Sequence, residues 1–320
     1  MKEPYIIKIA MVGPTRVGKS SIIASMYKTL DADLASKGIT FRATGQSSDI
    51  MDEKKADLQD LAEEDEPSVD SIFAITGDNT RSEYSFLVDL DPVKSDGDDI
   101  RIVFIDMPGR LYHNGNSDYD EPAKDIYDSD MSIVAIHTPA LMKGSRHQRE
   151  INKSDKIYNA FKKASPKEGS IIMMCPVRSE KWVNSGTMHS VYEKLRSEYA
   201  ELLNWAKGRK IRVVACCILT LGHLEFSEFL TQTNEDQFPE RYKRKRPEFA
   251  PKYCDIPLRV ALCEGCFRGS SKIQMEKHIG DVIWDWLKLP SEKNAKIETL
   301  QKFGRYLNET HLKDILVDLT

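Results

Sequence analysis

Runs of apolar residues alternate with helical patterns along about the first 220 residues of the chain. A short apolar run bounded by turn residues is typical of a buried strand, whereas apolar residues that recur every three or four positions form one face of a helix. Alternation of this kind is typical of an α/β fold with a doubly wound, mostly parallel sheet. The predicted strands are residues 5–12, 40–44, 84–90, 100–105, 131–136, 170–177 and 211–219, and the predicted helices are 19–34, 147–164 and 187–207.

Several stretches carry weaker patterns. Residues 84–90 alternate, which predicts an edge strand in a hairpin with residues 100–105. Residues 49–70 hold ten acidic residues and two lysines, which favours an exposed helix or an insert. Residues 107–127 lack periodicity and predict a long loop, a kind of segment that is often functional. Gly208 is the expected C-cap after the helix at 187–207.

The last third of the chain has a different pattern. Residues 231–256 are polar and predict a loop, and residues 258–262 predict a short strand. Residues 272–289 and 296–316 predict amphipathic helices, which form a C-terminal helical extension that we expect to pack on the sheet.

Composition limits the class of protein. The chain has 46 Lys and Arg against 50 Asp and Glu, a net charge of −4, and 40% hydrophobic residues, as in ordinary soluble proteins. Its apolar runs are too short for membrane insertion, and Lys2, Glu3 and Lys8 interrupt any secretory signal. Six cysteines without an export signal are expected to be reduced thiols, so a cytoplasmic location is expected. The near-neutral charge argues against broad nucleic-acid binding.

The strongest motif runs from Gly13 to Ser20 and reads Gly-Pro-Thr-Arg-Val-Gly-Lys-Ser. It matches G-x-x-x-x-G-K-[ST] in full and stands between a predicted strand and a predicted helix, as a phosphate-binding loop requires. Lys19 is expected to reach the β- and γ-phosphates, and the Ser20 hydroxyl to bind Mg²⁺. ATP, GTP and a kinase-type substrate are all compatible with this motif. The other residues expected to bind the nucleotide here are Thr15, Arg16, Val17, Gly18 and Ser21.

A second motif ends the strand predicted at residues 100–105. Its last residue is followed by Asp106, which fits the Walker B pattern of an aspartate that holds Mg²⁺. The run Asp106-Met-Pro-Gly109 also fits D-x-x-G, in which the glycine N–H binds the γ-phosphate. Together with the phosphate loop, this motif favours a nucleoside triphosphate as the ligand.

On these motifs, residues 5–226 resemble the translation-factor and Ras-related class of P-loop GTPases. The resemblance implies a P-loop nucleotide-binding domain, which we place at residues 1–230, followed by a region at 231–320 whose loop, strand and helices pack on it. More loosely, the chain is similar to bacterial proteins grouped as double-GTPase systems, in short segments at residues 136–142, 175–182 and 220–222.

In this class the base is read by N-K-x-D after a strand of the sheet. Residues 152–155 read Asn-Lys-Ser-Asp, but no apolar strand precedes them and their neighbours predict a helix, so we interpret them as a solvated helix face. After the strand at 170–177, Arg178 is instead expected to pack over the base and Glu180 to hydrogen-bond guanine. Thr220, after the next strand, is expected in the backbone loop that completes the base site. This departure from the class pattern leaves ATP possible.

The resemblance also implies two switch segments that respond to the γ-phosphate. Residues 66–82 would be the first switch and residues 107–127 the second. Thr80, four residues before Tyr84, is expected to complete Mg²⁺ coordination, with Thr76 as the second choice.

Hydrolysis is expected to be slow. Arg110 stands where many Ras-like proteins have the Gln that positions the attacking water. Arg110 or Arg16 would stabilise transition-state charge, although solvated or structural roles are the simpler alternative for both. A protein partner that supplies the missing group is therefore expected.

Two remaining features favour simple interpretations. Cys263 and Cys266, with Cys254 nearby, lack the second ligand pair of a zinc site, so buried thiols are expected. Residues 241–246 carry five basic side chains in six, which fits an acidic partner but more simply a solvated loop.

These patterns together predict a GTP-binding, Mg²⁺-dependent switch that cycles between GTP and GDP through slow, partner-stimulated hydrolysis. Two alternatives stay open. One is an ATP-directed P-loop enzyme, an ATPase or a kinase. The other is a nucleotide-bound interaction module with little turnover, for which Arg110 is the main support.

Overall fold

The computed structural model describes residues 4–35, 40–63, 81–89, 100–112, 119–222, 224–230, 240–245, 250–263 and 316–320. The strands within these ranges are β1 (Tyr5–Val12), β2 (Thr40–Ala43), β3 (Ser82–Asp89), β4 (Ile100–Asp106), β5 (Met131–His137), β6 (Ile171–Val177), β7 (Arg212–Ala215), β8 (Leu224–Phe229), β9 (Glu240–Arg244) and β10 (Val317–Asp318). The helices are α1 (Lys19–Ala35), α2 (Gln46–Glu63), α4 (Asp120–Asp128), α5 (Thr138–Lys143), α6 (Ser145–His147), α7 (Ser154–Ala164), α8 (Glu180–Asn184), α9 (Met188–Glu198) and α10 (Ala200–Gly208). Two shorter turns are the 3₁₀ turn η1 (Gly109–Tyr112) and the π-helical turn η2 (Gln148–Asn152).

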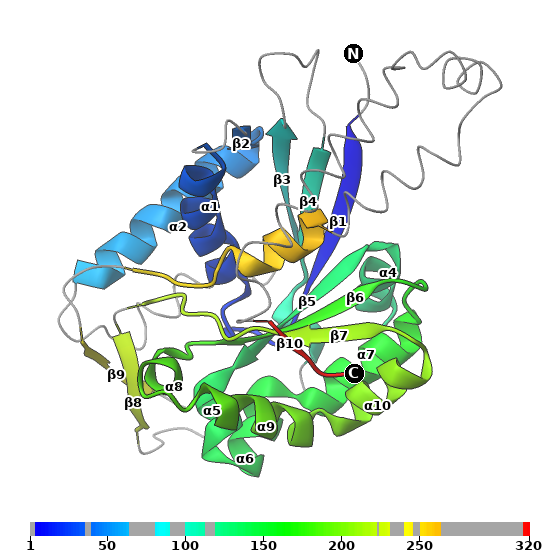
Figure 1. Cartoon of the computed structure of the whole chain (residues 1–320), viewed down its shortest axis with the longest axis vertical. Coiled ribbons are helices and arrows are strands. Elements are labelled where there is room, and N and C mark those ends of the chain that lie inside the picture. The colour runs from blue at the N-terminus through cyan, green and yellow to red at the C-terminus, as the bar shows by residue number, and fades with distance from the viewer. Residues whose placement is uncertain are drawn as a thin grey trace, which may run out of the picture.

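Within the described residues, eight of these strands form one sheet, in the order β10-β7-β6-β5-β1-β4-β3-β2 (Figure 1). The five strands from β7 to β4 run parallel, whereas β3 and β10 run antiparallel to their neighbours β4 and β7. The predicted α/β fold with a mostly parallel sheet is therefore confirmed. The strands β8 and β9 pair separately as a hairpin.

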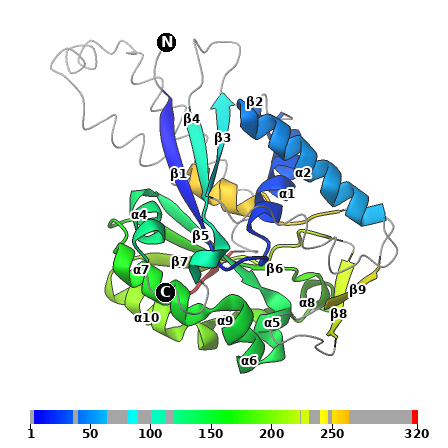
Figure 2. The ribbon, with the colours of Figure 1, turned by 180° about the vertical axis from the view of Figure 1, so that it is seen from behind.

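Helices cover both faces of the sheet, because β1 alternates between two cores. Ile7, Ile9 and Met11 pack in a core with α1, α2 and the helical residues 256–263. Ala10 and Val12 face the opposite core, which α4, α5, α7, α9 and α10 complete. Figures 1 and 2 show α1 and α2 on one side of the sheet and α4, α7, α9 and α10 on the other.

The register of the central strands fixes where the site lies. Met11 of β1 pairs with Asp106 of β4, and Val12 pairs with Val134 of β5. The carboxyl ends of these parallel strands therefore meet at one edge of the sheet, where ligands of doubly wound folds bind.

Several predictions about single elements are wrong. The strand β3 forms the predicted hairpin with β4, but β2 lies outside it, so β3 is not an edge strand. Residues 107–127 contain the helix α4 and are not one long loop. The helix predicted at 187–207 is two helices that meet at Tyr199, and the left-handed residue after them is Lys210 (φ 57°), not Gly208.

The C-terminal third also differs from its prediction. The polar stretch 231–256 contains β9, which pairs antiparallel with β8. Residues 256–263, which include the predicted strand 258–262, are helical. In the acidic stretch, α2 bears out the alternative of a helix up to Glu63. The helices predicted at 272–289 and 296–316 lie outside the described residues, except for residue 316, which is not helical.

Candidate functional site

The glycine-rich loop lies between β1 and α1, at the carboxyl edge of the sheet. Its backbone needs glycine at both glycine positions of the motif, because Gly13 has φ 146° and Gly18 has φ 100°. A Cβ on Gly13 would also lie 3.0 Å from the carbonyl oxygen of Ala135 on β5. Val17 and Ser21 are buried beside the loop, whereas Arg16 is exposed. The sequence motif thus has the strand–loop–helix context that its chemistry requires.

Lys19 folds back over its own loop. Its Nζ donates hydrogen bonds to the carbonyl oxygens of Gly13 (2.9 Å) and Pro14 (3.1 Å). The side chain is buried, and burial lowers the pKa of Lys19 while the charge of Asp106 opposes that effect. The ammonium group therefore lies against the carbonyl groups at the start of the glycine-rich loop.

Ser20 and Asp106 meet although 86 residues separate them. Ser20 Oγ donates to Asp106 Oδ2 at 2.8 Å, because the paired ends of β1 and β4 bring the two residues together. Burial raises the pKa of Asp106, and Lys19 and Ser20 oppose that rise. The other carboxylate oxygen, Oδ1, is buried and has no hydrogen-bond partner within the described residues. Such an orphaned oxygen is costly unless a cation or a donor reaches it.

The D-x-x-G segment packs directly on the glycine-rich loop. A Cβ on Gly109 would lie 2.1 Å from the backbone nitrogen of Thr15 and 2.5 Å from the carbonyl carbon of Pro14. Arg110, the next residue, lies in η1 with an exposed side chain. Thr80 and Thr76 lie outside the described residues, so their predicted role at the metal stays a prediction.

The two predicted parts of the base site are in contact. Glu180, at the start of α8, accepts hydrogen bonds on Oε1 from the backbone N–H groups of Leu221 (3.0 Å) and Gly222 (3.1 Å). Thr220 is buried, and its carbonyl oxygen accepts from Ser25 of α1 at 3.4 Å. The second oxygen of Glu180, Oε2, is buried without a partner in the described part of the chain. Burial raises the pKa of Glu180 to about 7, against the opposing effect of these amide groups and Arg178.

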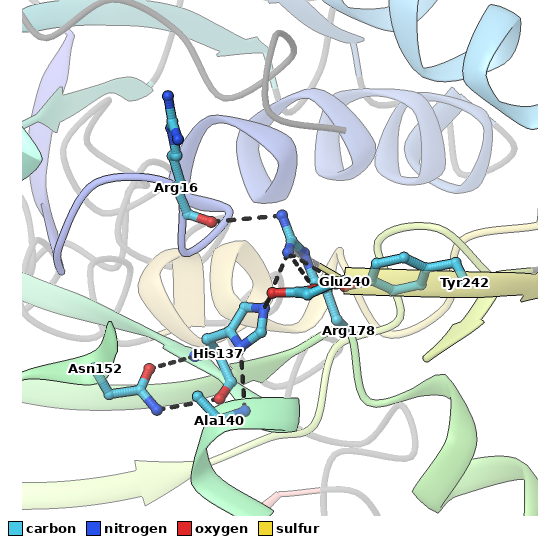
Figure 3. A network of polar contacts seen from close by, with 7 residues as sticks. All are labelled: Arg16, His137, Ala140, Asn152, Arg178, Glu240 and Tyr242. Carbon is cyan, nitrogen blue, oxygen red and sulfur yellow. Dashed lines mark hydrogen bonds and ion pairs between the residues drawn. The ribbon is translucent and has the colours of Figure 1, made fainter. Parts of the chain in front are cut away.

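Arg178 lies in a different environment from the one predicted for it. Its guanidinium is buried, and Nη1 donates to Glu240 Oε2 (3.2 Å) and to the hydroxyl of Tyr242 (3.2 Å), both on β9. Its Nη2 donates to the carbonyl oxygen of Arg16 in the phosphate loop at 3.4 Å (Figure 3). The predicted packing of Arg178 over a base stays a prediction, but its described contacts are with His137 (2.9 Å), the hairpin and the loop.

The sequence did not identify His137, Glu240 and Tyr242, which contact Arg178. His137, at the end of β5, accepts from the N–H of Ala140 on Nδ1 (3.2 Å), and its Nε2 lies 2.9 Å from both Glu240 Oε1 and Arg178 Nη1. Burial lowers the pKa of His137, although Glu240 opposes this. Glu240 and Tyr242 are the buried positions of an alternating strand. This alternation was the available signal, but its buried residues are polar, so an apolar pattern does not appear.

The literal N-K-x-D segment does not have the surroundings predicted for it. Asn152 ends η2 and is fully buried, with its side chain bonded to the backbone N–H (2.7 Å) and carbonyl (3.1 Å) of His137. Lys153 is left-handed (φ 51°) and buried, and Asp155 is exposed at the start of α7. The prediction of a solvated helix face is therefore wrong for Asn152, which supports the end of β5.

The predictions for the cysteines and for the basic run at residues 241–246 have different outcomes. Cys254 and Cys263 are buried, and Cys266 lies outside the described residues. Among the described residues, no group of three or more His, Cys, Asp or Glu side chains is arranged to hold a metal ion. The basic run is not a loop up to Arg244, because it forms β9 with Arg241 and Lys243 exposed. In the described ranges, no helix has the length and apolar character needed to cross a bilayer.

Comparison with known proteins gives only distant likenesses. No known protein family and no curated protein matches the sequence. Two solved structures of the GTPase-like domain of Ski7 from S. cerevisiae are similar to the chain at 12% identity, one bound to GTP (TM-score 0.42) and one bound to GDP and inorganic phosphate (TM-score 0.36). In both, the likeness covers 67% of this chain and 43% of the Ski7 chain.

Proposed function

We propose that this chain is a guanine-nucleotide-binding, Mg²⁺-dependent switch that hydrolyses the γ-phosphate slowly and is stimulated by a protein partner. One observation carries the proposal: Lys19, the Ser20–Asp106 pair and Gly109 converge on a single glycine-rich loop at the carboxyl edge of the sheet. Each of these groups addresses a different part of a nucleoside triphosphate.

The phosphates are held by the loop and by Lys19. Backbone N–H groups from Gly13 to Ser21 and the start of α1 supply donors and a positive dipole. On binding, the ammonium group of Lys19 exchanges the Gly13 and Pro14 carbonyls for phosphate oxygens. The Gly109 N–H, next to the loop, is positioned to sense the γ-phosphate.

The residues present fit a magnesium ion. Mg²⁺ prefers oxygen ligands, and Ser20 Oγ and Asp106 offer oxygens that lie together. The orphaned Oδ1 of Asp106 is the group that gains most from a nearby cation. When bound, the ion neutralises charge on the β- and γ-phosphates. Ser20 would hold it directly and Asp106 through water, with Thr80 as a further proposed ligand.

The base site is proposed at Glu180 and Thr220. Glu180 Oε1 already holds the backbone at Leu221 and Gly222, so Oε2 is the atom left to accept hydrogen bonds from guanine. Guanine can donate from N1–H and its exocyclic amine, whereas adenine has no donor at the corresponding two positions. This difference favours GTP over ATP.

Slow turnover is proposed from Arg110. This residue replaces the water-positioning Gln of many Ras-like proteins, and its side chain is exposed where a partner protein can contact it. The switches proposed at residues 66–82 and 107–127 would carry the response to the γ-phosphate.

Competition binding and single-turnover hydrolysis test this function. Fluorescent GTP is displaced from the full chain by GTP, GDP or ATP, with Mg²⁺ or EDTA, and phosphate release is followed separately. The proposal expects GTP and GDP to compete, ATP to compete poorly, and phosphate release to be slow. Preference for ATP would support a P-loop ATPase or kinase instead, and tight GTP binding without any phosphate release would support an interaction module.

Replacing Asp106 with Asn is expected to remove most of the Mg²⁺ dependence of GTP binding. The amide keeps the shape and the Ser20 hydrogen bond but lacks the charge that attracts the ion, so the gain in affinity on adding Mg²⁺ should fall about 10–100-fold. Titration of Mg²⁺ at constant GTP measures this effect. Asp155→Asn, on the exposed start of α7, is the matched control. An unchanged Mg²⁺ dependence in Asp106→Asn would exclude the metal role.

Replacing Glu180 with Gln is expected to weaken GTP binding about 10–100-fold and to reduce the preference over ATP, because the amide presents a donor to guanine. The wild-type affinity for GTP should rise as pH increases from about 6 to 8, since guanine needs the ionised carboxylate and the pKa of Glu180 is about 7. The Gln variant should lose that part of the rise. Asp155→Asn again serves as the control.

The same substitution has a predicted signature in stability. Because the folded pKa of Glu180 is raised from 4.5 to about 7, the unliganded protein loses stability as pH rises through that interval. The full difference corresponds to about 3 kcal/mol. Urea unfolding at pH 5 and pH 8 should show a smaller loss in Glu180→Gln. Equal losses in both proteins would contradict a buried carboxyl group with a raised pKa.

A further inference from the structure

The phosphate loop is touched by a side chain that its motif does not include. Arg178 is 3% exposed, has a left-handed backbone (φ 58°), and donates from Nη2 to the carbonyl oxygen of Arg16. Arg16 is itself left-handed (φ 68°), and Figure 3 shows its side chain pointing away from Arg178. The contact therefore depends on the Arg16 backbone and not on its side chain.

The hydrogen bond from Arg178 to the Arg16 carbonyl oxygen determines which way the N–H group of Val17 points. In a trans peptide the C=O and the following N–H point to opposite sides of the plane. Holding the Arg16 carbonyl toward Arg178 thus turns the N–H of Val17 away from Arg178. Val17 stands between Arg16 and Gly18 in the loop, where inward N–H groups bind phosphate. Arg178 consequently stabilises one orientation of the Arg16–Val17 peptide.

The β8–β9 hairpin holds Arg178 in place together with His137, whose Nε2 lies 2.9 Å from Arg178 Nη1. Glu240 and Tyr242 of β9 both accept from its Nη1 at 3.2 Å, and the guanidinium lies 5.9 Å from the centre of the Tyr242 ring. Tyr242 also donates to Glu240, and His137 lies 2.9 Å from the other oxygen of Glu240. Burial would raise the pKa of Glu240, but the adjacent His137, Arg178 and Tyr242 lower it to about 2, so this carboxylate stays ionised.

The hairpin also shares a small core with the nucleotide site. Leu224, Phe226 and Tyr242 pack with Ala24 of α1 and Leu221 of the proposed base loop. Its position is therefore linked to the helix that follows the phosphate loop and to the loop that Glu180 holds.

We infer that Arg178 is a positioning residue for the phosphate loop, and that nucleotide affinity depends on the β8–β9 hairpin because Glu240 holds Arg178. The inference rests on the proposed nucleotide function and deepens it. Arg178 acts on the ligand through the Arg16–Val17 peptide, and the hairpin acts on Arg178. A partner that moves the hairpin would thereby change the affinity for the phosphates.

Binding of GDP and GMP to Glu240→Gln tests the inference. The amide keeps the shape of Glu240 but removes the charge that holds Arg178, so affinity for GDP should fall about tenfold. GMP has no phosphate beyond the α position, so its affinity should change less than twofold. Arg241→Gln, which removes an exposed ion pair to Glu228 on the same hairpin, is the matched control and should leave both affinities unchanged.

A double-substitution cycle separates positioning from general structural damage. If Glu240 acts through Arg178, then Glu240→Gln should cause no further loss of GDP affinity in an Arg178→Met background. Should Glu240→Gln fail to fold, Tyr242→Phe replaces it, with an expected loss of about threefold for GDP and none for GMP.

The outcomes are distinguishable. Unchanged GDP affinity in Glu240→Gln, equal losses for GDP and GMP, or additive losses in the double variant would each overturn the inference and leave the proposed function standing. A wild-type chain that binds neither GTP nor GDP would overturn the proposed function and the inference with it.

Discussion

Replacing Lys19 with Met is expected to weaken GTP and GDP binding by at least about 100-fold while the unliganded protein stays folded. The loss follows from removing the charged donor that the β- and γ-phosphates would meet, since hydrogen bonds to charged groups are among the strongest. Met keeps the length of the side chain and fills the same buried space. The free protein loses the Nζ bonds to the carbonyls of Gly13 and Pro14 and the attraction between Lys19 and Asp106.

Charge compensation makes the Lys19 variant tolerable. Burial already lowers the pKa of Lys19 and raises the pKa of Asp106, so each charge is costly where it lies. Without Lys19, the carboxyl group of Asp106 can take up a proton and become neutral. Thermal unfolding of the unliganded variant should therefore stay close to that of the wild type.

Fluorescent-nucleotide binding and thermal unfolding measure the two halves of this prediction. Lys181→Met, an exposed lysine on α8, is the matched control and should retain binding. A folded Lys19→Met variant that binds GTP like the wild type would remove the phosphate loop from the proposed function.

Replacing Gly109 with Ala should cost about 3 kcal/mol of unfolding free energy and abolish the preference for GTP over GDP. A Cβ at this position would lie 2.1 Å from the nitrogen and 2.3 Å from the Cα of Thr15, and backbone atoms cannot move aside cheaply. The segment must then separate from the phosphate loop, with a penalty typical of overpacking. The Gly109 N–H moves with it, so the proposed contact to the γ-phosphate is lost.

Urea unfolding and the ratio of GTP to GDP affinities check the Gly109 prediction. Gly208→Ala is a suitable control, because a Cβ there has nothing within 4 Å and alanine favours the end of α10. That variant should be as stable as the wild type or slightly more stable. If Gly109→Ala matched it in stability, the close approach to Thr15 would not exist in solution.

The geometry of the glycine-rich loop at residues 13–20 was predictable because its determinants are local. A buried strand, two glycines with positive φ and a helix follow one another directly in sequence, so the pattern specifies the geometry. The meeting of Asp106 with Ser20 was also predictable, although 86 residues separate them. Both residues were expected at one magnesium ion, and the pairing of β1 with β4 brings them together.

Elements with polar buried faces were not predictable. The alternation in β9 places Glu240 and Tyr242 inside, and a polar inner face gives no apolar periodicity to detect. The pairing of β2 with the outer side of β3 was equally unpredictable, because strand order depends on long-range pairing and not on the composition of one strand. Residues 258–262 were assigned to a strand since a short apolar run suits a strand or a helix.

The sequence by itself determined the fold class and the position of the glycine-rich loop, since both depend on contiguous patterns of apolar residues and glycines. Only the tertiary structure decided what surrounds that loop. Arg178 meets Glu240 across 62 residues of chain, and Asn152 supports the end of β5 from a segment that reads as a surface helix. These contacts exist because buried polar groups must find partners wherever folding brings them together, and that requirement leaves no local trace.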